Sequence, residues 1–166
     1  MPELLEEKTG RLLLAQKLTI ACAESCTGGL LTSRLTDIAG SSAYVMGSVV
    51  SYTNRIKEAL VGVRHETLAA HGAVSEETAR EMAEGIRSVI KTDIGVGITG
   101  IAGPGGGTAK KPVGLVFIAV SGPQGTIVKE NHFSGTRLEV KRQTTDTALT
   151  MVCTYLEQLK AKSPEA

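Results

Sequence analysis

Apolar residues in this chain follow two patterns that alternate along its length. Short, largely apolar or β-branched runs predict strands, since a strand buried on both faces has no polar side. Segments in which apolar residues recur every three or four positions predict helices that bury one face. The predicted strands are 18–23, 44–52, 93–99, 113–121 and 126–133. The predicted helices are 4–16, a segment that begins near 30, 55–60, 66–71, about 75–90 and about 137–159.

This order of elements predicts the fold class. Helices alternate with strands over most of the chain, which is typical of a sheet covered by helices on both faces. The last two strands are separated by Gly-Pro-Gln-Gly and predict an antiparallel hairpin. We therefore expect an α/β fold, a single-domain layered α/β/α sandwich with a mixed sheet. The 166 residues suffice for one such domain, and we expect 1–3 and 160–166 to be frayed.

Helix boundaries and buried faces follow from local chemistry. Asn54 is predicted to cap the helix over 55–60, and Gly62 to end it. Ser75, followed by two acidic residues, is predicted to cap the next long helix. The residues of that helix expected to face inward are Ala79, Met82, Ala83, Ile86, Val89 and Ile90.

Composition and charge argue against several classes of function. The chain has 18 basic and 17 acidic residues and only 3% aromatics, so neither nucleic-acid nor membrane-surface binding is indicated. Its acidic N-terminus does not resemble a signal peptide, and no apolar run approaches the roughly 20 residues of a membrane span, so we expect a cytoplasmic location. Cys22, Cys26 and Cys153 lack the spacing of zinc ligands, and no metal or cofactor is expected.

The stretch Glu24-Ser25-Cys26-Thr27-Gly28-Gly29 lies where a buried strand is expected to turn into a helix. Backbone N–H groups at such a junction favour negative charge, and glycines allow close approach. Ser25 could therefore be a nucleophile beside an oxyanion site. The alternative is that Ser25 or Thr27 only caps the helix.

A nucleophilic serine needs a base, and Lys57 with Tyr52 is the better-placed candidate pair. None of His65, His71 and His132 falls in a recognisable catalytic motif. Tyr52 ends a predicted strand and Lys57 lies one turn into the following helix, so both can face one cleft. A lysine desolvated there would lose pKa and could act as base. The alternative is that Lys57 is an ordinary solvated helix residue.

The glycine-rich segment 100–108 directly follows a predicted strand. Its backbone N–H groups could form a concave anion site, although it matches neither the dinucleotide fingerprint nor the P-loop. The alternative is a mobile surface loop. The cations that could support an anion, or remain solvated, are Lys110, Lys111, Arg137 and Arg142.

Five motifs together resemble the C-terminal domain family of CinA, the competence/damage-inducible protein. They are AESCTGG, GSVVSYTNRIK, HGAVSEETA, GITGIAGPGGGT and KPVGLVFIAV, and the resemblance extends over about 4–159. Members act as nicotinamide-nucleotide amidases, so the resemblance implies conversion of nicotinamide mononucleotide to nicotinate mononucleotide and ammonia, in pyridine-nucleotide recycling and without a cofactor. It implies Ser25 as nucleophile, with Tyr52 and Lys57 completing a Ser–Tyr–Lys set.

The resemblance also implies a set of oxyanion and substrate-binding residues. Larger members carry a further N-terminal domain with pyrophosphatase activity, which we do not expect of this sequence. The family's GDR motif falls on Gly135-Thr136-Arg137, where Thr136 replaces the acidic residue. The implied residues are Cys26, Thr27, Gly28, Thr99, Gly100, Gly103, Gly105, Gly106, Gly107, Arg137 and Arg142.

Other functions stay open at this point. The chain could be a nucleotide- or phosphate-binding module without turnover, or an amidase of a different small amide. An interaction protein linked to competence or DNA damage is a further alternative, which charge and composition do not support. The expected partner is a small-molecule nucleotide, with neither nucleic acid nor membrane, and a homodimer or higher homo-oligomer is the usual expectation for such folds.

Overall fold

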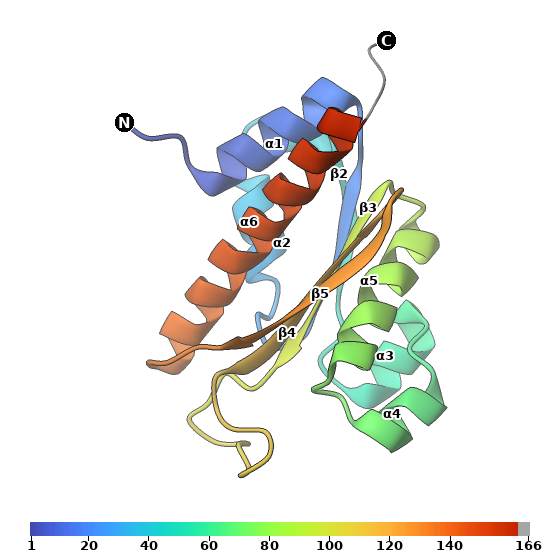
Figure 1. Ribbon diagram of the computed structural model, residues 1–166, viewed down its shortest axis with the longest axis vertical. Coiled ribbons are helices and arrows are strands. Elements are labelled where there is room, and N and C mark those ends of the chain that lie inside the picture. The colour runs from blue at the N-terminus through green and yellow to red at the C-terminus, as the bar shows by residue number, and fades with distance from the viewer. Residues whose placement is uncertain (163–166) are drawn as a thin grey trace.

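One five-stranded sheet forms the centre of the computed structural model, which describes residues 1–162 (Figure 1). Its strand order is β2-β1-β3-β4-β5. The first three of these strands run parallel, whereas β4 pairs antiparallel with both β3 and β5. The strands are β1 (Ile20–Glu24), β2 (Val45–Val50), β3 (Ile94–Gly100), β4 (Leu115–Gly122) and β5 (Gly125–His132). The mixed sheet and the hairpin of β4 and β5 confirm the expected topology.

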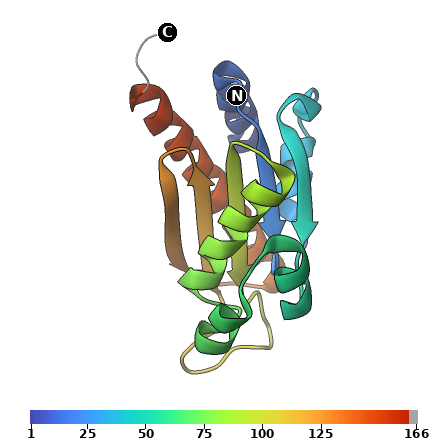
Figure 2. The same cartoon turned by 90° about the vertical axis from the view of Figure 1, so that its right-hand side faces the viewer.

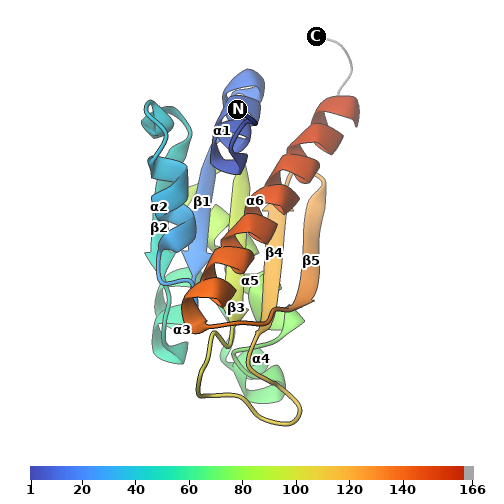
Figure 3. The same ribbon diagram turned by 90° about the vertical axis from the view of Figure 1, so that its left-hand side faces the viewer.

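Helices cover both faces of the sheet. Figure 3 shows α1, α2 and α6 together on one face, and Figure 2 shows α5 crossing the other face above α3 and α4. The helices are α1 (Leu5–Gln16), α2 (Leu30–Thr36), α3 (Asn54–Val61), α4 (His65–His71), α5 (Glu76–Ile90) and α6 (Arg137–Lys162). Buried residues form a larger core on the first face and smaller ones beneath α5. The layered α/β/α sandwich is therefore confirmed, and no helix within residues 1–162 has the length and apolar character to cross a membrane.

One predicted detail of α3 and one of α5 are wrong. The helix α3 is capped by Thr53, whose extended backbone and Oγ1 acceptor for Ile56 N start the helix one residue earlier than expected, at Asn54. Val89 is 54% exposed, because the buried stripe of α5 continues from Ile86 to Ile90. The caps at Gly62 and Ser75 are confirmed. The last helix extends past its predicted end to Lys162, so the expectation of a frayed end is wrong for 160–162, and the rest of that segment, 163–166, lies outside the described residues.

The alternating glycines of β3 let α5 lie directly against the sheet. A Cβ on Gly97 would collide with the backbone of Ala79 and Ala83 in α5, and one on Gly95 would collide with Ala83 and Arg87. The residues between them, such as Val96, point to the opposite face and are buried in the larger core. The sequence Gly-Val-Gly thus packs a helix on one face and apolar side chains on the other.

Replacing Gly97 with alanine is expected to lower the free energy of unfolding by about 2 kcal/mol, because the added methyl group must push α5 away from the sheet. Chemical denaturation measures the change. Gly47→Ala in β2 is the matched control, since a Cβ there would make only an ordinary contact with Ile90. Equal stability of the two variants would contradict this account of the packing.

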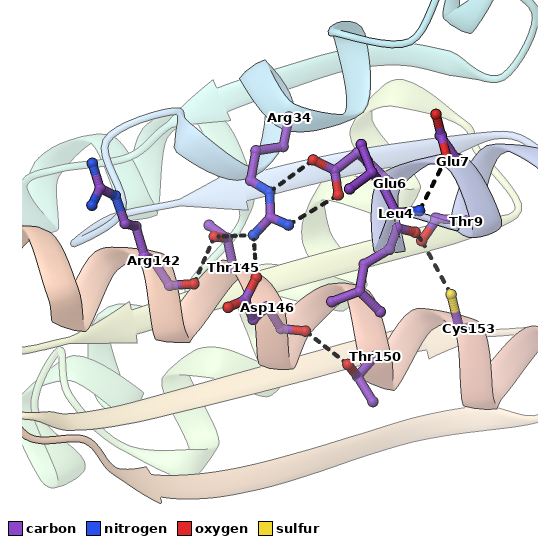
Figure 4. Close-up of polar contacts among 11 residues, drawn as sticks. Leu4, Glu6, Glu7, Thr9, Arg34, Arg142, Thr145, Asp146, Thr150 and Cys153 are labelled. Carbon is purple, nitrogen blue, oxygen red and sulfur yellow. Dashed lines mark hydrogen bonds and ion pairs between the residues drawn. The ribbon is translucent and has the colours of Figure 1, made fainter. Parts of the chain in front are cut away.

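Arg34 of α2 ties three helices together on the first face (Figure 4). Its guanidinium is bonded to the Glu6 carboxylate of α1, and its Nη1 donates to Thr145 Oγ1 (2.8 Å) and Asp146 Oδ1 (2.6 Å) of α6. Burial acts to raise the pKa of Glu6, but the contacts with Arg34 and a backbone hydrogen bond together outweigh it, so the pKa of this carboxyl is lowered. The same view shows the Arg142 side chain extending away from this cluster.

Candidate functional site

Ser25 follows β1 directly, at the edge of the sheet where the parallel strands end. The chain then turns through Gly28 and Gly29, whose φ values of +61° and +102° favour glycine, and α2 begins at Leu30. Because β2 and β3 end at the same edge, segments that follow them can reach Ser25. The predicted strand–turn–helix junction is confirmed.

The N-terminus of α2 is capped by Glu24, which was not anticipated from the sequence. Its buried carboxylate accepts from the backbone N–H groups of Leu31 and Thr32, both at 2.9 Å. It also accepts from the hydroxyls of Thr27 and Thr32, both at 2.6 Å. A carboxylate suits the positive end of a helix. Neither Ser25 nor Thr27 caps α2, so the capping interpretation of these two residues is wrong.

Lys57 holds the Ser25 side chain. Its Nζ lies 3.0 Å from Ser25 Oγ and donates to the backbone oxygen of Ser51 at 2.8 Å. The side chain is only 2% exposed, so the interpretation of Lys57 as a solvated residue is wrong. Burial lowers the pKa of Lys57, with an opposing smaller effect of Cys26. A lysine whose neutral form is made more accessible by burial, within hydrogen-bond reach of a serine hydroxyl, can accept that hydroxyl's proton.

Backbone N–H groups beside Ser25 supply donors for an oxyanion. The Gly28 N–H donates to the Ser25 carbonyl oxygen at 3.0 Å. The N–H groups of Cys26 and Thr27 have no hydrogen-bond acceptor among residues 1–162. Of these two residues only Cys26 borders the open space beside Ser25, so its N–H is the donor available to stabilise a developing negative charge on a substrate oxygen.

Tyr52 lies at the mouth of the same site but is bonded to a different partner. Its side chain is 57% exposed, and its hydroxyl accepts from Arg137 Nη2 at 3.0 Å. Arg137 Nη1 donates to the Gly103 carbonyl oxygen at 2.7 Å. Arg137, at the start of α6, thus joins the segment after β2 to the glycine-rich segment after β3. Thr136 and Glu139 bond reciprocally at this helix start, so Thr136 acts as the cap.

These groups surround one open cavity of about 280 Å³. Most of the implied site residues line it, whereas Thr27, Gly28, Gly107 and Arg142 do not. Thr27 is turned toward Glu24, and Arg142 is exposed on α6, where its spacing of five residues from Arg137 places it on another face. The predicted residues that line the cavity are Ser25, Cys26, Tyr52, Lys57, Thr99, Gly100, Gly103, Gly105, Gly106 and Arg137.

Several cavity residues were missed by sequence reasoning. The turn between α4 and α5 contributes Ala73 and Val74, and Thr99 Oγ1 fixes this turn by donating to the Ala73 carbonyl oxygen at 2.7 Å. The HGAVS motif offered a signal, but only the tertiary fold brings it beside β3. The remaining cavity residues that were missed are Asn54, Ile101 and Ala102.

Other chemistry is poorly supported at this site. Burial raises the pKa of the Cys26 thiol to about 12, so this cysteine stays protonated and is a poor nucleophile. Within residues 1–162 no group of three or more His, Cys, Asp or Glu side chains is placed to hold a metal ion.

Comparison with known proteins identifies the family of this chain. Residues 2–156 match the model of a family described as the CinA C-terminal domain. This chain belongs to that family. It is 52% identical over 155 residues to a "CinA-like protein" of Syntrophus aciditrophicus, covering 93% of this chain and 37% of that protein. The chain spans little more than a third of the length of the first curated relatives that it matches.

Solved structures of CinA-related proteins match over nearly their whole length. The crystal structure of the competence/damage inducible protein CihA from Agrobacterium tumefaciens is 42% identical, with a TM-score of 0.88, and the match covers 95% of this chain and 98% of that one. The competence damage-inducible protein A (ComA) from Klebsiella pneumoniae is 35% identical, with a TM-score of 0.89, over 92% of this chain and 95% of that one. The fold of this CinA-family chain therefore has experimentally determined counterparts.

Proposed function

We propose that this chain is an amidase that converts nicotinamide mononucleotide to nicotinate mononucleotide and ammonia. The contact between Lys57 Nζ and Ser25 Oγ carries the proposal, because a buried lysine bonded to a serine beside free N–H groups is suited to acyl transfer. The choice of substrate rests on the resemblance to CinA-type amidases.

In the proposed reaction Ser25 Oγ attacks the carboxamide carbon while its proton passes to neutral Lys57. The oxygen that becomes negative is stabilised by the N–H group of Cys26, which lines the cavity. The C–N bond then breaks, and ammonia leaves with the proton that Lys57 had accepted from Ser25. Tyr52, at the cavity mouth, relays this proton to the leaving nitrogen. Water hydrolyses the ester on Ser25, Lys57 accepts the water proton and returns it to Ser25, and the carboxylate product leaves.

The cavity mouth supports a nucleotide as substrate. Arg137 contributes a guanidinium there, bonded to two neutral oxygens, those of Tyr52 and Gly103. A phosphate oxygen binds a guanidinium more strongly than a neutral oxygen does, so the substrate phosphate can replace either partner. Gly105 and Gly106 line the cavity with backbone alone, which allows a phosphate to approach their N–H groups.

Ammonia release by the purified chain tests this function. We expect release from nicotinamide mononucleotide with equal formation of nicotinate mononucleotide, and much slower release from free nicotinamide or nicotinamide riboside, which lack the phosphate. Saturable binding of the nucleotide without turnover would replace the amidase by a binding module. Faster turnover of another small amide would reassign the substrate.

A further inference from the structure

Asn54 is a polar residue of the cavity that has no role in the proposed reaction. The sequence predicted it as a helix cap, but Thr53 makes that contact. The Asn54 side chain is exposed, its residue lines the cavity, and it has no hydrogen-bond partner among residues 1–162. Its amide is therefore available to a ligand in the cavity.

The position of Asn54 relates it directly to the reacting serine. It is the first residue of α3 and precedes Lys57 by three positions. Residues three apart share one face of a helix, with Cβ atoms roughly 5–6 Å apart. Lys57 is bonded to Ser25, and Asn54 lines the same cavity as both residues.

A primary carboxamide held at Ser25 needs hydrogen-bond donors for its oxygen and an acceptor for its NH₂ group, and the groups described so far provide only the first. Its oxygen can accept from the N–H group of Cys26. Its NH₂ group needs an acceptor, and the single lone pair of neutral Lys57 is reserved for the Ser25 proton in the proposed reaction. The Tyr52 hydroxyl is engaged by Arg137. The Oδ1 of Asn54 is an acceptor of the required kind on the lysine side of the site.

We propose that Asn54 is the specificity residue for the carboxamide group, with its Oδ1 accepting from the substrate NH₂. This inference rests on the proposed function, because it assumes that the carboxamide is held at Ser25. The contact orients the carboxamide with its oxygen toward the N–H group of Cys26. It is lost in the product, whose carboxylate has no N–H, so Asn54 favours substrate over product in the same cavity.

Calorimetric binding to the full chain carrying Ser25→Ala, which prevents turnover, tests the contact. In this background we expect Asn54→Leu to weaken binding of nicotinamide mononucleotide about tenfold, and that of nicotinate mononucleotide less than twofold. Asn54→Asp keeps an acceptor for the substrate NH₂ and adds a negative charge that repels the carboxylate of the product. This variant should therefore prefer the amide ligand more strongly than the Asn54 chain does. Arg55→Ala, at the exposed neighbouring position, is the matched control and should change neither affinity.

The outcomes separate this inference from the proposed function. Equal weakening of both ligands by Asn54→Leu, or of neither, would overturn the inference even if the wild-type chain releases ammonia. Selective weakening of the amide ligand in a chain that shows no wild-type turnover would support Asn54 as the carboxamide contact and reject hydrolysis. A failure of nicotinamide mononucleotide to bind at all would overturn both.

Discussion

Replacing Ser25 with alanine is expected to lower kcat for nicotinamide mononucleotide by at least about 1,000-fold, because the variant cannot form the ester intermediate. The effect of this substitution on the fold should be small, since Ser25 Oγ does not cap α2. Thermal unfolding and nucleotide binding should therefore stay close to those of the wild-type chain. Ammonia release and calorimetry measure the two effects separately.

The matched control is Ser33→Ala, an exposed serine on α2 that lies outside the cavity lining. This variant should retain wild-type turnover. If Ser25→Ala retained turnover within a few-fold of the wild type, the assignment of the nucleophile would be wrong. Loss of both folding and turnover in Ser25→Ala would instead indicate a structural role.

Replacing Lys57 with methionine, which is of similar length and uncharged, is expected to lower kcat/KM by at least about 100-fold. Lys57→Arg should be equally impaired, because a guanidinium keeps the positive charge but does not deprotonate at accessible pH. Rescue by arginine would show that Lys57 acts through its charge alone and would contradict its role as base. The comparison uses the same ammonia assay for all three chains.

The pH dependence gives a second test of Lys57. Only neutral Lys57 can accept the Ser25 proton, so kcat/KM should rise with pH through the lowered pKa of this lysine, at a pH below the normal range of lysine. The same lowering affects stability. Between the folded pKa and the unfolded pKa near 10.4 the unfolded chain binds the extra proton, so stability rises with pH in that window.

The penalty of burying this lysine is fully present below its folded pKa and absent above its unfolded pKa. Lys57→Met removes the titrating group, so its stability relative to the wild-type chain should be greatest at low pH and should decline as pH rises through the window. Denaturation midpoints of both chains, measured in parallel across pH, test this. A constant difference between the midpoints would contradict the lowered pKa.

The helices and strands, and the strand–turn–helix junction at Ser25, could be predicted from the sequence. The apolar runs predicted every strand within a few residues, and the break at Ser25 predicted where the strand ends. The positions of Tyr52 at the end of a predicted strand and of Lys57 one turn into the next helix correctly suggested that both face one cavity. These inferences succeeded because they depend on periodicity and on neighbours close in the chain.

The contacts that complete the site depend on residues far apart in the chain and were not predictable. The pairing of Arg137 with Tyr52 spans 85 positions, and that with Gly103 spans 34. The cap of α2 by Glu24 was missed because this acid precedes the helix by several residues, outside the usual cap position. Thr53 and Asn54 are both good capping residues, and only the backbone conformation decides between them.

Homo-oligomerisation and a cytoplasmic location stay predictions. Light scattering of the purified chain addresses the first and cell fractionation the second.

Identification of the acylated residue tests the central claim most directly. The chain is mixed with excess nicotinamide mononucleotide, quenched in acid during turnover, digested and mapped by mass spectrometry. We predict the nicotinate mononucleotide acyl group as an ester on Ser25, and no such adduct in Ser25→Ala. Acylation of any other residue, Cys26 included, or turnover with equal labelling of the Ser25→Ala chain, would contradict a serine nucleophile activated by Lys57.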